Sequence, residues 1–261
     1  MKKIFLCATV AVAMCFASCE GFDASEILDR LDNLENQLDD LKNNEENNQG
    51  EDNSGDNGGE EGIPADKTKA IAFTDTRAKF ICTFYWDENG DGELSYEEAG
   101  NVTDIGRVFN DAAVISFMEL QYFTGVTHLP DLSFSSNLAL HNIAFPNTLV
   151  SIGKFIFGNT AAQRNYNIEE IMLPAGLINI GSGAFYMCKN LRYVYCQAAT
   201  PPVIQSKGTS SSNGVYESAP SFSFQDIEQS VIYVPRTSIE AYKSADGWKD
   251  YAEIIKPYDF E

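Results

Sequence analysis

Histidine is scarce in this sequence, and the common catalytic motifs are absent. Only His128 and His141 occur among its 261 residues, and no GxSxG, HExxH, P-loop or GxGxxG pattern accompanies them. A histidine without a nucleophile or a metal ligand at motif spacing is more often a surface residue than a catalytic base. These absences argue against catalysis, and we expect a non-enzymatic protein.

Positive charge is scarce as well. The 18 lysines and arginines face 38 aspartates and glutamates, for a net charge of −20. Between Glu20 and Gly62 there are 15 acidic and 2 basic residues, so this stretch alone carries a net charge of −13. Because an acidic protein repels phosphate backbones, the composition excludes nucleic acid as an expected partner.

Only one long apolar run is present, and it lies at the N-terminus. Lys2 and Lys3 precede the run from Ile4 to Phe16, which is too short to span a membrane and has the order of a secretion signal. The run ends in Phe16-Ala17-Ser18-Cys19, which resembles the lipobox of bacterial lipoproteins. The resemblance implies a signal peptide over residues 1–18 and a lipid on Cys19; ordinary signal cleavage beside an incidental cysteine is the alternative.

Cysteines are too few for a disulfide framework. Of the six, Cys7 and Cys15 leave with the signal peptide and Cys19 carries the lipid. The remaining three cannot pair completely: Cys82, Cys188 and Cys196. The last two occupy core positions of the repeats described below, so we expect small buried residues rather than reactive thiols.

The acidic stretch after Cys19 has two parts. Apolar residues at alternating spacings of four and three lie on one seam of a helix: Ile27, Leu31, Leu34, Leu38 and Leu41. A short coiled coil over residues 24–42 would permit weak self-association, whereas its many Asp and Asn residues favour a loosely helical stalk; both interpretations remain open. Residues 43–62 contain no apolar side chain and form a disordered tether that spreads over roughly 25 Å.

The second half of the chain contains an internal repeat. Seven residues of 140–157 match seven of 168–185 at an offset of 28. They are Leu140, Ile143, Pro146, Leu149, Ile152, Gly153 and Phe157, matched by Ile168, Ile171, Pro174, Leu177, Ile180, Gly181 and Phe185. Partial copies on either side recur at an offset of 23, so the unit is 23 residues long and residues 160–167 contain a five-residue insertion. A unit this short cannot bury its own apolar face and must stack on its neighbours as a solenoid.

Each repeat is expected to hold a short strand followed by a turn. Side chains alternate along a strand, so Ile171 and Leu173 point the same way, and Pro174 ends the strand by removing a ladder donor. Gly153 and Gly181 are expected at the turn that sends the chain back.

This pattern resembles the BspA-type leucine-rich repeats of bacterial surface proteins. The phrases IEEIMLPAGLINIGSGAFYMCKNL and IYVPRTSIEAYKSADGWKDYAEII carry the resemblance, which covers residues 115–258. The resemblance implies a secreted or lipid-anchored protein. It therefore agrees with the N-terminal signal.

A twelve-residue loop from Asp87 to Glu98, DENGDGELSYEE, carries the pattern of a calcium site. It has acidic or amide oxygens at positions 1, 3 and 5, glycine at 6, leucine at 8 and glutamate at 12. Calcium takes six to eight oxygens at about 2.4 Å, and a glycine at position 6 permits the sharp turn that gathers them. We expect calcium to bind through side-chain oxygens, the Glu93 carbonyl, and the Ser95 hydroxyl or a water bridged to it. The side chains are those of Asp87, Asn89, Asp91 and Glu98.

The flanks of this loop agree with an EF-hand, since apolar residues precede it and an exiting turn over residues 96–102 follows. EF-hands ordinarily occur in pairs, whereas this chain has one. We therefore expect a structural ion at the entrance of the solenoid. The segment that enters the loop is expected to present an apolar face of Phe80, Ile81 and Phe84. We expect the first repeat to be capped by Phe80, Phe84 and Trp86. An Asx-rich turn that holds no metal is the alternative.

The exposed face of the strands is the candidate binding surface. If alternate residues such as Ile171, Val194 and Ile232 point inward, the residues between them point outward from successive strands. These are Glu170, Met172, Tyr193, Tyr195, Val231 and Tyr233. Tyrosine suits recognition because it offers a rigid face and a hydroxyl. Alternatively, the long insertion 197–229 folds back over this face as a lid.

Together these features predict an α/β protein with a short leucine-rich-repeat solenoid and a small parallel sheet over residues 111–261. A helix-loop-helix, EF-hand-like segment over 66–110 precedes it, and the N-terminal part divides into a signal peptide at 1–18, a lipid-anchored helical stalk at 19–42 and a linker at 43–65. We expect a lipid-anchored protein of the cell envelope, exposed at the outer membrane, whose repeats bind a protein or glycan. The alternative is a calcium-dependent assembly module that resembles dockerins, which normally carry two such loops.

Overall fold

The computed structural model describes residues 63–165, 167–224 and 226–260 of the chain. All of them belong to one compact unit, Glu61–Glu261. The predicted signal peptide, the lipidation site Cys19, the stalk and nearly all of the linker lie outside the described residues. Within the described part of the chain, no helix has the length and apolar character needed to cross a membrane.

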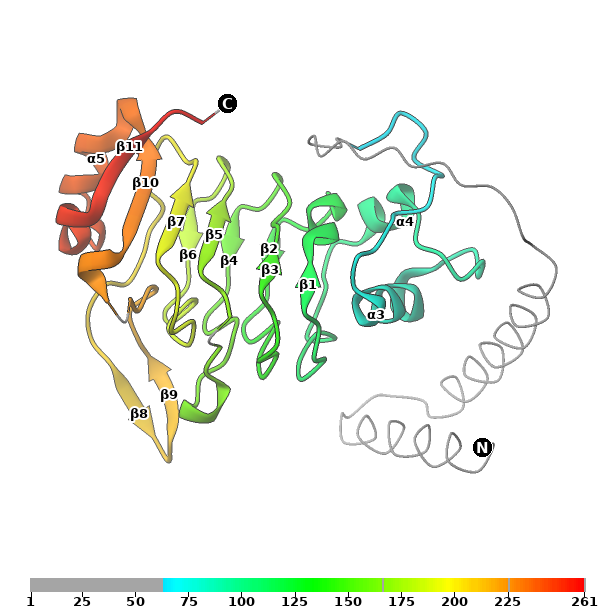
Figure 1. Cartoon of the computed structure of the whole chain (residues 1–261), viewed down its shortest axis with the longest axis horizontal. Coiled ribbons are helices and arrows are strands. Elements are labelled where there is room, and N and C mark those ends of the chain that lie inside the picture. The colour runs from blue at the N-terminus through cyan, green and yellow to red at the C-terminus, as the bar shows by residue number, and fades with distance from the viewer. Residues whose placement is uncertain (1–62, 166, 225, 261) are drawn as a thin grey trace. The chain divides into compact units, whose positions relative to one another are not determined.

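Two helices precede the repeats, α3 (Thr76–Trp86) and α4 (Tyr96–Asn101), as Figure 1 shows. Asp75 caps α3, because its Oδ1 accepts hydrogen bonds from backbone N–H groups of the first turn. Its Oδ2 accepts from the N–H of Ile115 at 2.6 Å. The same carboxylate therefore begins the helix and ties it to the first repeat.

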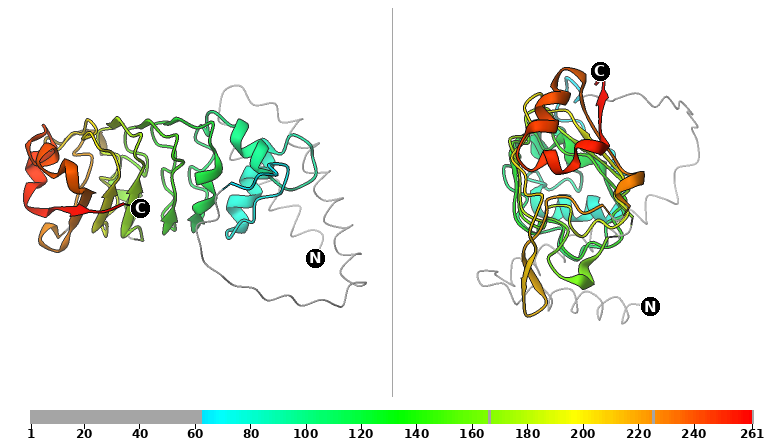
Figure 2. Two further views of the ribbon diagram at one scale, coloured as in Figure 1. Left: turned by 90° about the horizontal axis from the view of Figure 1, so that it is seen from above. Right: turned by 90° about the vertical axis from the view of Figure 1, so that its left-hand side faces the viewer.

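The repeats form coils with two strand positions each, which succeed one another in Figure 1 and Figure 2. At the first position lie the parallel pair β1-β3 and a four-stranded parallel sheet in the order β11-β10-β7-β5. Their bounds are β1 Ser116–Phe117, β3 Asn142–Ile143, β5 Glu170–Leu173, β7 Tyr193–Cys196, β10 Val231–Pro235 and β11 Ile255–Tyr258. At the second position lies the parallel sheet of β2 His128–Leu129, β4 Ser151–Ile152 and β6 Asn179–Ile180.

The remaining elements are short. An antiparallel hairpin of β8 (Ser210–Ser212) and β9 (Val215–Ser218) extends from the insertion, and α5 (Ile239–Ser244) follows β10. The 3-10 segments are η1 Met118–Tyr122, η2 Ala161–Gln163, η3 Ile227–Gln229, η4 Arg236–Ser238 and η5 Trp248–Ile254. Parallel strands with few helices are the α/β solenoid that the repeat predicted. The prediction of one strand per repeat was incomplete, because it missed the second position.

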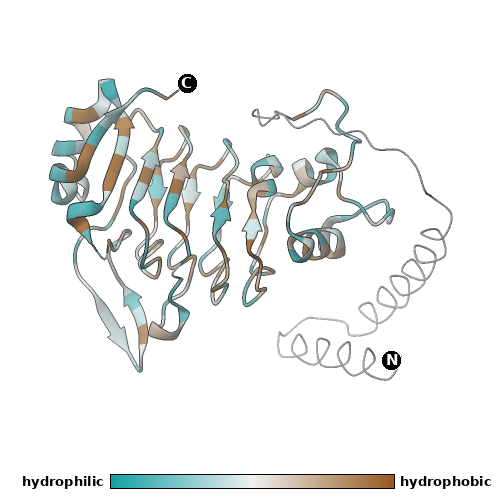
Figure 3. Ribbon diagram, viewed as in Figure 1, coloured by the Kyte–Doolittle hydropathy of each residue, from teal (hydrophilic) through white to brown (hydrophobic). Residues whose placement is uncertain are grey.

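A column of stacked phenylalanines runs through the coils at the level of the turn after the second strand. Neighbouring rings have centroids 5.3 to 6.0 Å apart, and all five are buried: Phe109, Phe134, Phe157, Phe185 and Phe222. The repeat spacing in sequence thus becomes a continuous apolar core. Figure 3 shows apolar residues recurring from coil to coil.

Gly153 and Gly181 serve coil stacking rather than an unusual backbone conformation, since neither has a positive φ. A Cβ on Gly181 would lie 2.6 Å from the carbonyl carbon of Gly153, and one on Gly153 would lie 2.6 Å from the backbone N of Asp131. Only glycine permits this backbone-to-backbone approach.

The N-terminal end of the core is closed by aromatic residues, although not by all those predicted. At the first repeat, Trp86 packs on Phe123 with ring centroids 5.4 Å apart, as expected. Phe80 does not cap the repeat, because its side chain is 49% exposed while α3 buries Ala78 and Cys82 instead. Of the predicted entering face, Ile81 does pack against the core, whereas Phe80 does not, because the small residues of α3 make the closest approach.

Candidate functional site

The strand face has the predicted register. Glu170 and Val231 flank Tyr193 across the sheet, and Met172 and Tyr233 flank Tyr195. The residues between them, such as Ile171, Val194 and Ile232, are buried. Met172 is 51% exposed and Tyr193 is 37% exposed. All the predicted contact residues therefore lie on one face of the four-stranded sheet.

Two further aromatic residues extend this face beyond the prediction. Tyr258 on β11 lies 5.5 Å from Tyr195 and 5.4 Å from Tyr233 between ring centroids, and Phe260 lies 4.8 Å from Tyr258. Tyr195 and Tyr233 stack at 4.9 Å with an interplanar angle of 18°. The side chains in the sequence IIKPYDF alternate as in a strand, and this pattern could have predicted β11. We call Met172, Tyr193, Tyr195, Tyr233, Tyr258 and Phe260 the aromatic face.

The insertion 197–229 does not cover the aromatic face. Its Val203 bridges to Asn179 of β6, and Ser221 Oγ donates to the carbonyl oxygens of Ile180 and Gly181. These contacts belong to the second strand position, so the insertion extends the β2-β4-β6 side of the coils. The lid interpretation is wrong for the described residues.

Within the aromatic face, Tyr195 keeps its hydroxyl protonated at neutral pH. Burial, together with the charges of Glu170 and the neighbouring tyrosines, raises the pKa of Tyr195. A protonated phenol both donates and accepts hydrogen bonds, which suits recognition of a polar surface.

A hollow interrupts the strand ladder beside the aromatic face. No hydrogen-bonded pairing joins β3 to β5, and the hollow between them is lined by Ile115, His141, Asn142, Asn167, Glu169, Glu170 and Tyr193. The break follows the five-residue insertion in 160–167, which separates these two coils along the chain. Strands β3 and β5 appear as successive elements in Figure 1.

The acidic loop folds around its own backbone. Asp87 accepts from the N–H groups of Gly90 (2.7 Å) and Gly92 (2.8 Å), and both glycines have a positive φ. Asn89 Oδ1 accepts from the N–H of Asp91 at 2.8 Å, and Asp91 Oδ1 accepts from the N–H two residues further on at 2.9 Å. The loop therefore makes the sharp turn that the glycine pattern predicts.

Glu98 and Ser95 begin helix α4. Glu98 Oε2 accepts from the N–H of Ser95 at 2.8 Å and from its hydroxyl at 2.7 Å, while Glu98 Oε1 accepts from the N–H groups of Glu88 and Asn89. Both Ser95 and Glu98 are buried. This capping box gives both residues a structural role in addition to their predicted role as ligands.

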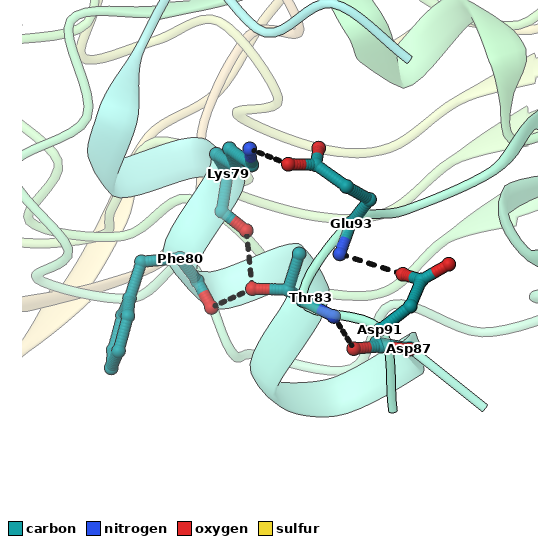
Figure 4. Close-up of polar contacts among 7 residues, drawn as sticks. Lys79, Phe80, Thr83, Asp87, Asp91 and Glu93 are labelled. Carbon is teal, nitrogen blue, oxygen red and sulfur yellow. Dashed lines mark hydrogen bonds and ion pairs between the residues drawn. The ribbon is translucent and has the colours of Figure 1, made fainter. Parts of the chain in front are cut away.

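The remaining acidic ligand, Glu93, faces Lys79. Its Oε1 lies 2.6 Å from Lys79 Nζ, which Figure 4 shows together with the hydrogen bond from the Glu93 N–H to Asp91. Carboxylate, amide and hydroxyl oxygens in one glycine-turned loop form a donor set that fits calcium. Within the described residues, however, no three Asp, Glu, His or Cys side chains converge on one point. The carboxylates accept from the loop's own N–H groups instead.

The loop has a pairing partner within the chain. Ala70 bridges to Ser95 in antiparallel orientation, and the N–H of Ile71 donates to the carbonyl oxygen of Leu94 at 2.8 Å. In a paired EF-hand, the second loop takes this place. Here the segment before α3 pairs with the backbone of the loop, so the single loop has the partner that a second loop would otherwise supply.

The three remaining cysteines are buried and free, and this burial was expected for Cys188 and Cys196. Burial raises the pKa of Cys196 to about 11, and it also raises the pKa of Cys82 and of Cys188 above the ordinary value of a thiol. Thiols held neutral in this way are poor nucleophiles. They act as small core residues.

Comparison with known families assigns the solenoid. Residues 107–234 match the model of the BspA type leucine rich repeat region, in six copies. The solenoid is therefore similar to BspA-type leucine-rich repeats over these residues. The match begins ahead of the predicted boundary at residue 111, in agreement with the place of Phe109 at the start of the phenylalanine column. No curated protein matches the chain.

The family match gives a coarse function. Leucine-rich repeats generally mediate protein interactions, and proteins with BspA-type repeats are often bacterial surface proteins. The match therefore indicates a protein-binding repeat module. The binding surface, the anchor and the ion belong to the proposal that follows.

Proposed function

We propose that this is a non-enzymatic, lipid-anchored surface protein whose repeats bind a protein partner through the aromatic face. The observation that carries the proposal is the cluster of exposed side chains on one parallel sheet, with Met172 51%, Tyr258 41% and Tyr193 37% exposed. Exposed apolar groups gathered on one surface are typical of interaction sites. The insertion 197–229, which was the alternative cover, lies on the β2-β4-β6 side.

The ring geometry favours a protein over a glycan. Tyr195 and Tyr233 stack on one another at 18°, so each ring uses one of its faces in contact with the other. A sugar ring stacks on a free aromatic face, whereas a protein surface fills gaps between ring edges and pairs with hydroxyls. Tyr193 retains more of its surface and is the natural centre of the contact.

Binding experiments with matched variants test the proposal. The partner would first be captured by cross-linking to the full chain on intact cells and then purified. We expect Tyr193→Ser and Met172→Ser to weaken its affinity at least tenfold, as removal of central interface residues does. Ile178→Ser removes a residue that is 63% exposed but lies beside β6, and it should have little effect. Equal weakening by all three variants would contradict the proposed surface.

We also propose that the Asp87–Glu98 loop binds calcium as a structural ion. The side chains of Asp87, Asn89, Asp91 and Glu98 would hold it, with the Glu93 carbonyl and the Ser95 hydroxyl completing the set. Calcium would supply positive charge to a loop that is rich in carboxylates. Support comes from the donor set and from Gly92, which has a positive φ at the predicted position 6. The pairing of Ser95 with Ala70 weighs against the dockerin-like alternative, because the loop edge is already occupied.

The anchor is the third part of the proposal. The sequence around Cys19 supports a lipidated N-terminus, an outer-membrane location and exposure at the cell surface. Mass spectrometry of the membrane fraction should find a mature chain that begins at Cys19 with an attached diacylglycerol. An unmodified soluble chain that begins at another residue would contradict the anchor while leaving the binding surface untouched.

A further inference from the structure

The hollow between β3 and β5 is rich in hydrogen-bond acceptors and carries unpaired negative charge. Glu169 and Glu170 line it, and neither carboxylate has an ion pair or hydrogen bond among the residues that the structure describes. Unpaired carboxylates attract a cation, and a group that approaches between two of them gains from both.

Two other residues of the hollow have their donors fixed elsewhere. The Asn167 side chain donates from Nδ2 to the carbonyl oxygen of Leu138 at 2.7 Å, which orients the amide and leaves Oδ1 as an acceptor. His141 Nδ1 lies 2.7 Å from the carbonyl oxygen of Ala139. A carbonyl only accepts, so Nδ1 carries a proton and donates it to Ala139.

Tyr193 supplies an aromatic wall to the same hollow. It is the first residue of β7, where it is paired across the sheet with Glu170 of β5. An aromatic ring beside carboxylates matches a flat cation, which stacks on the ring while its N–H groups reach the oxygens.

We propose that this hollow takes the guanidinium of an arginine from the partner protein. Guanidinium has five N–H donors in one plane and no acceptor, which complements a hollow that offers acceptors, charge and an aromatic wall. A lysine ammonium carries its charge at one point and stacks less well on the ring. The inference rests on the proposed function, since it assigns one contact of the partner that binds the aromatic face.

A methyl NMR titration of the full chain tests this inference without the partner. Ile115 lines the hollow, so its δ1 methyl reports on occupation, while the methyl of Ile227, an exposed residue on η3, is the internal control. The probes are the N-acetyl amides of arginine, lysine and citrulline. Citrulline has nearly the shape of arginine but no charge.

We expect the arginine amide to shift the Ile115 methyl with a dissociation constant on the order of tens of millimolar. The Ile227 methyl should stay in place, and citrulline should have no effect on either. The double variant Glu169→Gln, Glu170→Gln should weaken arginine binding about fivefold. Its control, Glu217→Gln with Glu228→Gln, makes the same change in net charge at exposed positions outside the hollow and should bind as the unmodified chain does.

Three outcomes would overturn the inference. They are an Ile115 methyl that no probe shifts, an equal response to citrulline, and an equal loss in both double variants. An equal response to the lysine amide would overturn the preference for guanidinium. If the titration fails while Tyr193→Ser still abolishes partner binding, only this inference fails. If arginine binds and the aromatic-face variants keep the partner, the proposed function fails instead.

Discussion

Calcium should raise the melting temperature of the chain, and the size of the effect follows from linkage. A ligand at 100 times its dissociation constant adds about 2.7 kcal/mol to the free energy of unfolding. For a folded unit of this size, Glu61–Glu261, each kcal/mol shifts the melting temperature by roughly 2 to 4 °C. We therefore expect a rise of roughly 5 to 10 °C between chelator and saturating calcium. Magnesium should do less, because it demands tighter octahedral geometry.

The structure decides which substitution isolates the ion. Glu98→Gln would remove a predicted ligand, but Glu98 also accepts from two backbone N–H groups and from both donors of Ser95. Its loss would cost about 1 to 3 kcal/mol even in chelator, because a buried capping box is broken. Asp91→Asn is cleaner, since Asp91 lies on the exposed part of the loop and the amide oxygen can still accept from the Glu93 N–H.

Differential scanning calorimetry of five samples checks this reasoning. The unmodified chain and Asp91→Asn should melt at nearly the same temperature in chelator, and only the unmodified chain should show the full calcium shift. Glu98→Gln should melt lower than both in chelator. Identical melting curves for the unmodified chain in calcium and in chelator would mean that the loop is an Asx-rich turn held by its own N–H groups.

Three further predictions concern the stability of the solenoid. Phe185→Ala removes a fully buried ring between Phe157 and Phe222. In denaturant titrations it should lower the free energy of unfolding by about 3 to 5 kcal/mol. A loss below about 1 kcal/mol would mean that the neighbouring rings move to fill the cavity. Gly181→Ala should lower the free energy of unfolding by about 1 to 3 kcal/mol, because its Cβ would lie 2.6 Å from the neighbouring coil. Gly176→Ala should be tolerated, because the nearest atoms to its Cβ would be 3.7 Å away. Equal melting temperatures of the two variants would contradict the stacking argument. Burial acts to raise the pKa of Asp75, but hydrogen bonds from the N–H groups of Ile115, Ala78, Ser116 and Arg77 outweigh it and leave the pKa below its ordinary value of 3.8. The contribution of Asp75 to stability is therefore present above pH 3.8 and is lost as the pH falls through the lower pKa of the folded state. Asp75→Asn should flatten the acid side of the stability profile.

The repeat could be predicted because its equivalent residues recur at a regular spacing along the sequence. Ile152 and Ile180 occupy equivalent places 28 residues apart, and the structure pairs them in register on β4 and β6. The outward direction of Tyr193 and Tyr195 was predictable for a similar reason, since the alternation along a strand needs only the correct inward set.

Other features depend on contacts that spacing does not encode. Strands β4 and β6 have two residues each, too few to show an alternating pattern. The direction of the insertion 197–229 depends on Val203 pairing with Asn179, and nothing in its composition selects that strand. Phe80 was predicted to face the core because its side chain is large and apolar. However, α3 packs against the core through the small side chains of Ala78 and Cys82.

The candidate site was predictable in part. The six outward residues of β5, β7 and β10 were identified, whereas Tyr258 was missed because β11 follows a 3-10 segment and has no equivalent in the repeat. The hollow was also missed. Its signal was the five-residue insertion in 160–167, which marked where two neighbouring coils differ in length.

The most direct test of the aromatic face is site-specific photo-cross-linking. A benzoylphenylalanine placed at Tyr193 in the full chain on living cells should form a covalent adduct with the partner, and the same residue placed at Ile178 should not. Both positions are exposed, with Tyr193 on β7 and Ile178 beside β6, so the pair separates the two sides of the coils. Adducts at Ile178 with none at Tyr193 would contradict the account and move the binding surface to the β2-β4-β6 side.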